Sequence, residues 1–322
     1  MTGTVCLAVY RPDEALLRAQ IGSIRAQTLR EWDCVIGIDG ADERARAAVT
    51  RAVGGDDRFR VIEYDENVGF YRNFERLLGE VGEDRDWVAL ADQDDLWYPR
   101  KLESLVPLLR DADLAFGQAR VVTAGAAEAV GETTSRRSTT VAAAVIDNQV
   151  TGSIAVLRRS LLHTALPMPD PTDSAFHDHW LGICALAGRG IAVLPDAVQD
   201  YVQHGANVIG EERPRTVSER LASLAARSGG GAGAGLDFIS IHRWGWRVNM
   251  ARTALERAHG ADIAGGDFLA AVARNRLSLA LVAGVTREIV ARRVPPLRAV
   301  ALLAGAWRAP RLERSSSSGI PE

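Results

Sequence analysis

Three carboxylates within four consecutive residues are the part of this sequence best suited to chemistry. Asp92, Asp94 and Asp95 follow the apolar run 87–91, which predicts a buried strand. Ligands of open α/β sheets bind beyond the carboxyl ends of strands. Carboxylates so close together repel one another, which favours a bound cation, and their hard oxygen atoms suit Mg²⁺ or Mn²⁺. An acidic turn with a helix cap explains these residues alone equally well.

The elements that must position this cluster follow an alternating order. The first 120 residues alternate strand and helix patterns, which predicts an α/β fold with a mostly parallel sheet flanked by helices. We expect strands at 4–10, 32–39, 59–64, 87–92, 114–122 and 191–194. We expect helices at 13–28, 41–53, 68–81, 173–188, 237–258 and 264–293, with a short one after residue 296. Residues 123–148 are rich in small and polar side chains and predict a long surface loop.

Polar residues follow each of the first four predicted strands. Tyr10 and Arg11 follow the first strand, Asp39 the second, Asn67 the third, and the acidic cluster the fourth. Because the carboxyl ends of parallel strands share one edge of a sheet, these residues outline a crevice of nucleotide size. Asp39 could accept a hydrogen bond from a nucleobase. A turn residue before a glycine explains Asp39 equally well.

Four ordered motifs give the sequence a resemblance to a known family. They read Val-Tyr-Arg-Pro, Ile-Asp-Gly, Asn-Val-Gly-Phe-Tyr-Arg-Asn-Phe and Ala-Asp-Gln-Asp-Asp-Leu-Trp-Tyr-Pro-Arg-Lys-Leu. Over roughly residues 4–210 the chain resembles inverting family-2 glycosyltransferases of the GT-A fold, in particular the bacterial rhamnosyltransferase-like branch that builds surface polysaccharides. The resemblance implies a Rossmann-like sheet with an α-helical C-terminal extension.

The resemblance also implies roles on the donor side. Asp92 and Asp94 would form an Asp-x-Asp motif that holds Mn²⁺ or Mg²⁺, with Asp94 the more direct ligand. The ion would bridge the donor's diphosphate and neutralise charge as the nucleotide departs. Asp39 would contact a uridine or thymidine base. An exposed helix face explains Arg72 equally well. The residues assigned to nucleotide and donor binding are Tyr10, Arg11, Asp39, Asn67, Arg72, Asp92 and Gln93.

Residues 201–210 resemble the family's Tyr-Arg-Gln-His-Gly-x-Asn-x-x-Gly segment. That segment is thought to close over the donor phosphates, which implies that His204 contacts the metal or the diphosphate. Val202 stands where the family usually has Arg, so a phosphate contact at that position is in doubt. The histidines alone could suggest zinc, but His177 and His179 would point apart on a helix and no cysteine spacing completes the ligand set.

The segment Phe-His-Asp-His-Trp at 176–180 resembles the family's His-Asp-x-Trp motif. This implies that Asp178 is the general base, which takes the proton of the acceptor hydroxyl as it attacks the anomeric carbon. One such step inverts the anomeric centre. From the residues alone, Asp178 is a first-turn carboxylate that complements the helix dipole. The acceptor-side residues that the resemblance implies are Thr151, Gly152, Ser153, His177, His179 and Trp180.

Composition divides the chain unevenly. Residues 1–212 carry 21 basic and 33 acidic side chains, whereas residues 213–322 carry 17 and 8. We expect a catalytic domain over 1–212, whose nucleotide-sugar half ends near 120 and whose acceptor half spans 121–212. A flexible linker over 213–235, helices over 236–312 and a disordered tail over 313–322 would follow.

No apolar stretch approaches the ~20 residues that span a bilayer, and the three cysteines lie in apolar contexts, so a cytoplasmic protein is expected. The basic C-terminal helices contain Trp244, Trp246 and Trp307. That mixture predicts peripheral contact with the inner face of the plasma membrane, although plain helix packing explains it equally well. No nucleic acid partner is expected, and the oligomeric state does not follow from the sequence.

The resulting prediction is an inverting, metal-dependent glycosyltransferase. Its donor would be a nucleotide-diphosphate sugar of the dTDP-rhamnose or UDP-hexose type, and its acceptor a hydroxyl of a glycan or a lipid-linked glycan. A nucleotidyltransferase that acts on a sugar phosphate stays open, although residues 10–14 do not resemble a loop that grips a triphosphate. A non-catalytic nucleotide-sugar-binding protein is the third alternative.

Overall fold

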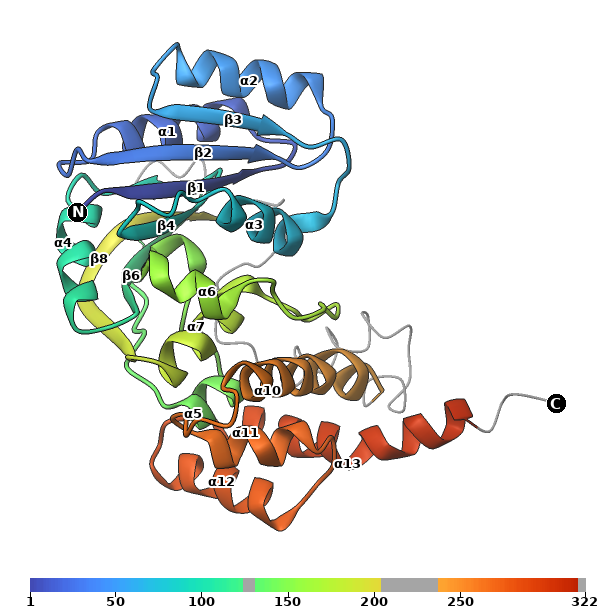
Figure 1. Ribbon diagram of the computed structural model, residues 1–322. Helices are drawn as coiled ribbons and strands as arrows, with labels where there is room; N and C mark the ends of the chain where they lie inside the picture. The colour runs from blue at the N-terminus through green and yellow to red at the C-terminus, as the bar shows by residue number, and fades with distance from the viewer. Residues whose placement is uncertain (124–130, 204–236, 318–322) are drawn as a thin grey trace. The chain divides into compact units, whose positions relative to one another are not determined.

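The computed structural model describes residues 1–123, 131–203 and 237–317. The strands in these ranges form one sheet of eight, in the order β3-β2-β1-β4-β7-β6-β8-β5. Their bounds are β1 (Gly3–Val9), β2 (Trp32–Ile38), β3 (Phe59–Glu63), β4 (Trp87–Asp92), β5 (Leu96–Trp97), β6 (Leu114–Thr123), β7 (Ala155–Arg158) and β8 (Ile191–Gln203). The predicted mostly parallel α/β sheet is therefore confirmed (Figure 1).

Helices and short 3-10 segments connect these strands. The helices of the first two-thirds of the chain are α1 (Glu14–Arg25), α2 (Glu43–Val53), α3 (Gly69–Gly79), α4 (Lys101–Leu105), α5 (Val141–Ile146), α6 (Leu162–Ala165) and α7 (His177–Ala187). The later ones are the π-helix η4 (Ile239–Trp244), α10 (Gly245–Arg257), α11 (Gly266–Ala273), α12 (Leu279–Val290) and α13 (Pro296–Ser317). The 3-10 segments are η1 (Val106–Arg110), η2 (Gly152–Ile154) and η3 (Arg159–Leu161).

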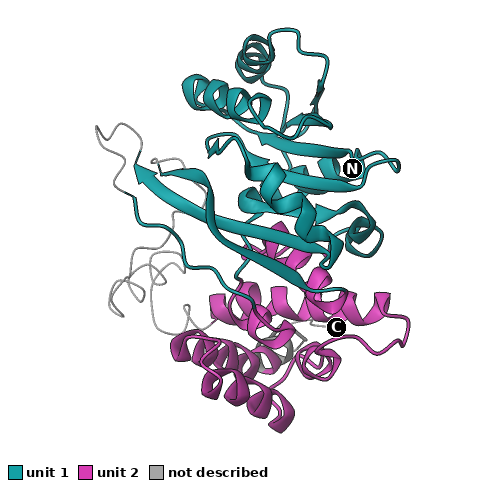
Figure 2. Ribbon diagram, turned by 90° about the vertical axis from the view of Figure 1, so that its left-hand side faces the viewer, with its two compact units in different colours: residues 1–138, 149–168, 189–211 teal, residues 139–148, 169–188, 212–322 magenta. Residues whose placement is uncertain are grey.

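The chain divides into two compact units (Figure 2). Unit 1 comprises residues 1–138, 149–168 and 189–211 and contains the whole sheet, and unit 2 comprises residues 139–148, 169–188 and 212–322. The core of unit 1 lies between the sheet and its helices. In unit 2 the helices α5, α7 and α10–α13 pack on one another, and the largest buried side chains there are Trp180, Trp244 and Trp246.

Local sequence explains the parallel half of the sheet. The side chains of Asp13 and Asp42 accept hydrogen bonds from the first turns of α1 and α2 and so start both helices. Gly37 lets α3 approach β2 closely, because a Cβ at that position would lie 2.8 Å from Cδ2 of Leu77. Asn73 on α3 donates to the carbonyl of Gly37 at 3.1 Å, which fixes α3 against the strand.

Several sequence-based boundaries were wrong. The predicted surface loop contains helix α5, whose apolar residues are buried, and β8 is far longer than the expected strand at 191–194. The expected helix at 264–293 is interrupted near Asn275, which has a φ of 53°, and the helix after 296 is long. Trp244 and Trp246 are buried, so they do not form the predicted exposed aromatic surface.

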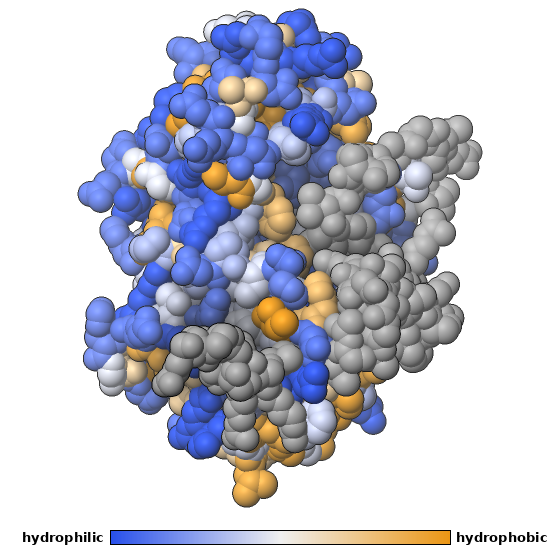
Figure 3. Space-filling view, turned by 90° about the vertical axis from the view of Figure 1, so that its right-hand side faces the viewer, coloured by the Kyte–Doolittle hydropathy of each residue, from blue (hydrophilic) through white to orange (hydrophobic). Residues whose placement is uncertain are grey.

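The predicted linker at 213–235 lies outside the described residues. Helix α13 continues to Ser317, into the segment expected to be a tail. No helix of the described ranges is both long and apolar enough to cross a membrane. The face drawn in Figure 3 is largely hydrophilic, with hydrophobic side chains gathered toward its lower end.

Candidate active site

Parallel register brings the predicted polar residues to one edge of the sheet. Ala8 of β1 pairs with both Gly37 of β2 and Asp92 of β4. Tyr10 and Asp39, which follow β1 and β2, therefore lie at the same carboxyl edge as Asp92. This is the edge at which ligands of open α/β sheets bind.

The side chain of Gln93 joins the ends of β1 and β4. Its Oε1 accepts from the amide of Tyr10 at 2.8 Å, and its Nε2 donates to the carbonyl of Tyr10 at 3.0 Å. Gln93 is therefore committed to the backbone, whereas Asp92 and Asp94 lie half-buried beside it. Arg11 has a φ of 42°, and its guanidinium carbon lies 5.1 Å from the centre of the exposed Tyr10 ring.

Asp39 anchors the loop that follows β3. Its side chain is buried, and Oδ1 accepts a hydrogen bond of 2.9 Å from the amide of Val68. Asn67 donates to the carbonyl of Asp39 at 3.4 Å, so the loops after β2 and β3 hold these two predicted donor-binding residues together. Gly40 has a φ of 92°, and a Cβ there would lie 3.3 Å from Asn67. A backbone this tight favours glycine.

Arg72 is part of a local cluster on helix α3. Its guanidinium forms an ion pair of 2.5 Å with Glu75 and lies over the ring of Tyr71. The other carboxylate oxygen of Glu75 accepts from the amide of Met168. Arg72 is about one-third exposed, so its position is compatible with both the donor-binding role and the helix-surface interpretation.

A buried network that the sequence did not predict lies next to the acidic motif. The side chain of Lys101 is 1% exposed and donates to Oε1 of Gln199 at 2.7 Å and to the carbonyl of Ser153. Nε2 of Gln199 donates to Asp95 at 2.6 Å and to the hydroxyl of Ser153 at 2.9 Å. The Lys101 ammonium also lies 3.6 Å from the centre of the Trp97 ring. Such a cation–π contact helps to compensate its burial.

The network shifts the protonation equilibria of both charged members. Burial, and next the charge of Asp94, raise the pKa of Asp95 to about 7. Burial lowers the pKa of Lys101 well below its usual value, against the opposing effect of Asp95 and Asp92. An ammonium and a carboxylate in one buried network each favour the charged form of the other, so removal of Lys101 would leave Asp95 without its compensating charge.

Ser153 was predicted on the acceptor side together with Thr151 and Gly152. The structure buries Ser153 and Gly152 within η2, where Ser153 is fixed by Gln199 and Lys101, and leaves Thr151 half-buried. The only lysine among the 38 basic residues was the one signal that could have drawn attention to this network.

A second polar cluster holds β5, β6 and β8 together. Tyr98 donates to Asp200 at 2.6 Å, and Arg120 donates to both oxygens of the same carboxylate at 2.7 Å. Burial, and next the hydrogen bond to Asp200, raise the pKa of Tyr98 to about 12. Because Asp200 follows Gln199 on β8, this cluster fixes the strand that supplies Gln199 to the buried network.

The predicted general base lies in unit 2, in the first turn of α7. Asp178 is half-buried, and its Oδ1 accepts from the side chain of Asn148 at 3.1 Å. His177, His179 and Trp180 are buried, and Nε2 of His179 lies 2.8 Å from the carbonyl of Ala144 on α5. These three side chains therefore pack inside unit 2, whereas Asp178 keeps access to solvent.

Three anchors fix the segment that carries Asn148. Besides His179, Arg247 of α10 donates to the carbonyl of Val145 at 3.0 Å. Arg298 of α13 forms an ion pair with the buried Asp147. Helices α7, α10 and α13 thus jointly position Asn148, and with it the orientation of the Asp178 carboxylate.

Asp92 and Asp94 fit a hard divalent cation. Among the described residues, no group of three or more His, Cys, Asp or Glu side chains is placed to hold a metal. Two carboxylates suffice for Mg²⁺ or Mn²⁺ when substrate phosphates and water complete the shell. His204, the third predicted ligand, lies outside the described residues.

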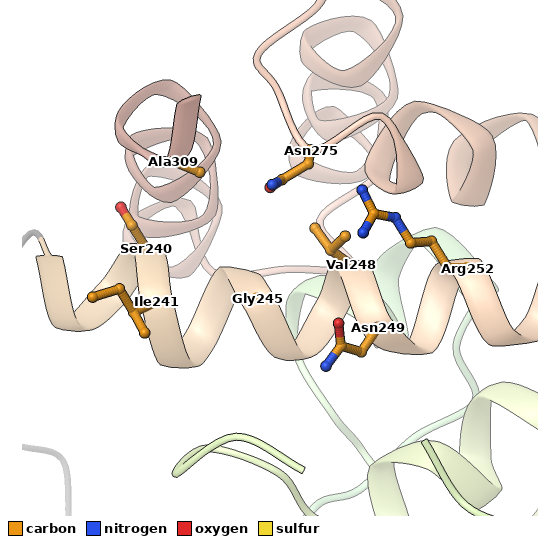
Figure 4. Close-up of a pocket in the computed structure, with 8 residues that line it drawn as sticks. All are labelled: Ser240, Ile241, Gly245, Val248, Asn249, Arg252, Asn275 and Ala309. Carbon is orange, nitrogen blue, oxygen red and sulfur yellow. The ribbon is translucent and has the colours of Figure 1, made fainter. Parts of the chain in front are cut away.

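A separate hollow lies within unit 2, between η4, α10 and α13 (Figure 4). Its polar side chains are already bonded within the protein. Ser240 donates to the carbonyl of Gly305, Arg252 donates to the carbonyl of Ala273, and Asn275 accepts from Trp244. It therefore offers few unused groups for a ligand.

Comparison with known proteins decides the family. The profile of the family described as Glycosyl transferase family 2 matches residues 4–164, which is half of the chain. The chain belongs to glycosyl transferase family 2. The matched residues include the whole acidic motif and the buried Lys101. The rhamnosyltransferase-like branch is not shown by this match.

Relatives agree with the family and fold. An uncharacterized glycosyltransferase, alr2836 of Nostoc sp. (strain PCC 7120 / SAG 25.82 / UTEX 2576), is 31% identical over 116 residues, which cover 34% of this chain and 34% of that protein. The chain thus matches about a third of the length of its curated relatives. The structure of S. aureus TarS 1-349 in complex with UDP-GlcNAc aligns with 99% of this chain and 92% of that chain, at 14% identity and a TM-score of 0.54. This likeness shows the GT-A fold.

We predict that Lys101→Met destabilises the protein by about 3 kcal/mol, because it leaves Asp95 uncompensated and two buried acceptors without their donor. Urea unfolding at neutral pH measures this. The matched control is Arg100→Met, whose guanidinium is 75% exposed and bonded to Glu103. That variant should change stability by less than about 1 kcal/mol. A Lys101→Met variant as stable as the control would contradict the role of the network.

We predict that unit 2 loses stability as the pH falls from 7 to 5. Burial lowers the pKa of His177 and of His179 to about 3, whereas an unfolded histidine titrates near 6.5. The unfolded state then binds more protons below pH 6.5, so each histidine costs about 2 kcal/mol over this range. Urea unfolding at several pH values checks this. His177→Gln should reduce the slope, and the exposed His163→Gln should not. Equal slopes in all three proteins would contradict it.

Proposed function

We propose that this protein is an inverting glycosyltransferase. It transfers a sugar from a nucleotide-diphosphate sugar to a hydroxyl of a glycan or lipid-linked acceptor during assembly of a surface polysaccharide. The observation that carries the proposal is the arrangement of the acidic motif in a family 2 chain. Asp92 and Asp94 lie half-buried at the carboxyl edge of the sheet and would form the ligand pair, whereas Gln93 and Asp95 form hydrogen bonds that fix the motif within the protein. The resemblance to the rhamnosyltransferase-like branch suggests dTDP-rhamnose or a UDP-hexose as the donor.

The donor would bind at the carboxyl edge of β1, β2 and β4. Oδ1 of Asp39 accepts from the amide of Val68, and the carboxylate would offer its other oxygen to a base N–H. Tyr10 and Arg11 are exposed beside it and suit the nucleoside and the diphosphate. Asp92 and Asp94 would hold Mg²⁺ or Mn²⁺, which when bound neutralises the charge of the leaving diphosphate. Arg72 and Asn67 complete the proposed set.

Asp178 would act as the general base. Its carboxylate takes the proton of the acceptor hydroxyl while the hydroxyl oxygen forms a bond to the anomeric carbon. The bond between that carbon and the diphosphate oxygen breaks on the opposite face, so the configuration inverts and the nucleotide diphosphate leaves. Asn148 donates to Oδ1 of this carboxylate at 3.1 Å and would orient it toward the acceptor hydroxyl.

The remaining acceptor-side residues take supporting roles in this proposal. His179 and Trp180 are buried, so they would position α7 and not touch the sugar. His177 is buried as well and would hold the start of the helix. Thr151 and Gly152 would let the acceptor approach closely, because a threonine and a glycine take up little space.

We predict that UDP or dTDP raises the melting temperature only when Mn²⁺ is present, and that Asp94→Asn abolishes this shift. A ligand that binds only the folded state stabilises it by about 2.7 kcal/mol at a hundredfold excess over Kd. Differential scanning fluorimetry with UDP, dTDP, GDP and ADP measures it. Asp111→Asn, an exposed carboxylate of the same unit, is the control and should keep the shift. Negligible shifts with every nucleotide would contradict the donor site.

We predict that Asp178→Asn lowers kcat by roughly 10²–10⁴, the usual contribution of a general base, and leaves nucleotide binding intact. The assay measures release of nucleotide diphosphate with candidate acceptors, and NMR of the product tests inversion at the anomeric carbon. Asp173→Asn, with an exposed carboxylate that precedes α7, is the matched control. If Asp178→Asn has a kcat within about threefold of wild type, Asp178 is not the general base.

A further inference from the structure

Helix α12 exposes an apolar stripe that nothing in the described structure covers. Leu279 is 90% exposed and Val290 is 77% exposed, although both are aliphatic. Ala283 and Thr286 lie between them and are exposed too. The spacing of these four residues, 4, 3 and 4, places them on one face of the helix. The opposite face is the one that packs into unit 2, through Leu281, Val285 and Glu288.

Helix α13 carries a similar stripe. Leu297, Val300 and Trp307 are 45%, 59% and 46% exposed, and their spacing of 3 and 7 keeps them on one side of the helix. Helices α12 and α13 contact each other, and hydrophobic side chains reach the surface at the lower end of Figure 3. Large aliphatic and aromatic side chains exposed on successive helices mark an interaction surface more often than chance.

The segment that contains the α12 stripe is strongly basic. Residues 274–300 carry six arginines and one glutamate. That glutamate, Glu288, is buried and bonded to Arg293, and Arg298 is bonded to Asp147. The other four arginines are exposed and form no ion pair within the described ranges. They are Arg274, Arg276, Arg287 and Arg292.

We infer that this surface, defined by Leu279, Ala283, Thr286, Val290 and the four exposed arginines, docks on an anionic lipid bilayer. An apolar helix face flanked by cations is the pattern of an interfacial helix, whose apolar side chains enter the headgroup region while arginines contact lipid phosphates. The inference names a different surface from the one expected from Trp244 and Trp246, which are buried. It deepens the proposed function, because a lipid-linked acceptor resides at such a bilayer.

A second copy of the chain is the competing occupant. A symmetric dimer through this face would place the same patch of both subunits together. The four arginines of one subunit would then meet four arginines of the other, and like charges across an interface oppose association. A bilayer that contains phosphatidylglycerol offers the complementary charge.

The test is sedimentation of the full chain with large vesicles. One set contains phosphatidylcholine alone, and the other contains phosphatidylcholine mixed with phosphatidylglycerol. We expect the protein to bind the anionic vesicles, with an affinity at least roughly tenfold higher than for the neutral ones. Each basic residue near an anionic surface raises the affinity about fivefold. Binding should also fall between about 0.1 M and about 1 M NaCl, where the Debye length shortens from about 10 Å to about 3 Å.

Two variants separate the apolar and the charged contributions. Leu279→Ser/Val290→Ser removes the stripe, and Arg274→Gln/Arg276→Gln/Arg287→Gln removes three cations. Each should reduce anionic-vesicle binding at least roughly tenfold. The matched control in unit 1 is Val61→Ser/Arg44→Gln, which replaces a 40% exposed valine and an exposed arginine and should bind like wild type. All substituted side chains are exposed, and circular dichroism verifies the fold.

Equal binding to both kinds of vesicle, or unchanged binding by both variants, would overturn the inference. Sedimentation velocity supplies the other decisive outcome: a dimer that Leu279→Ser/Val290→Ser abolishes would assign the face to a second copy. The Mn²⁺-dependent nucleotide shift of both variants should equal that of wild type. A variant that loses vesicle binding but keeps the nucleotide shift shows that only the docking surface has been damaged. If wild type itself shows no nucleotide shift, the proposed function fails, and the vesicle result is unaffected.

Discussion

A buried carboxylate must be compensated where it lies, and the donor side of this protein depends on that constraint at Asp95. Lys101 supplies the charge, and Gln199 and Ser153 connect the two through hydrogen bonds. These four residues come from the β4–β5 turn, α4, β8 and η2. To satisfy Asp95, β8 must run beside β6 and reach β5. The hydrogen bond between Gln199 and Asp95 therefore links the acidic motif to the half of the sheet that contains antiparallel pairs, formed by β5, β6, β7 and β8.

In unit 2, hydrogen bonds and an ion pair hold the segment that orients Asp178. This segment, 139–148, is short and buries the apolar side chains of helix α5, and polar contacts add to this packing. His179, Arg247 and Arg298 each bond this segment from a different helix. The buried, neutral state of His179 is part of this arrangement, because burial is what lowers its pKa. The position of one half-buried carboxylate thus depends on side chains from three other parts of unit 2.

The sequence was sufficient to predict the parallel strands and the polar residues that follow them. Strands and helices show hydrophobic periods of 2 and 3.6 residues, and turns contain characteristic residues, so all three signals are local. The role of Lys101 was not predictable in this way, since its partner Gln199 is 98 residues away and no local pattern joins them. Helix α5 follows a polar stretch and has only six residues, which are too few to show a helical hydrophobic period in the sequence. Trp244 and Trp246 looked interfacial because a helical pattern does not reveal which neighbour covers a side chain.

The four residues of the acidic motif, 92–95, have similar side chains but different roles. Gln93 extends the pairing of β1 and β4, Asp95 is enclosed by the network, and only Asp92 and Asp94 keep half-buried carboxylates at the edge. Two carboxylates hold Mg²⁺ weakly, because this ion retains water and prefers substrate phosphates as further ligands. In the proposed function, metal and nucleotide would therefore bind cooperatively, each raising the affinity of the other by the same factor. The enclosed Asp95 fits this arrangement, because a third exposed carboxylate would hold the ion without the donor.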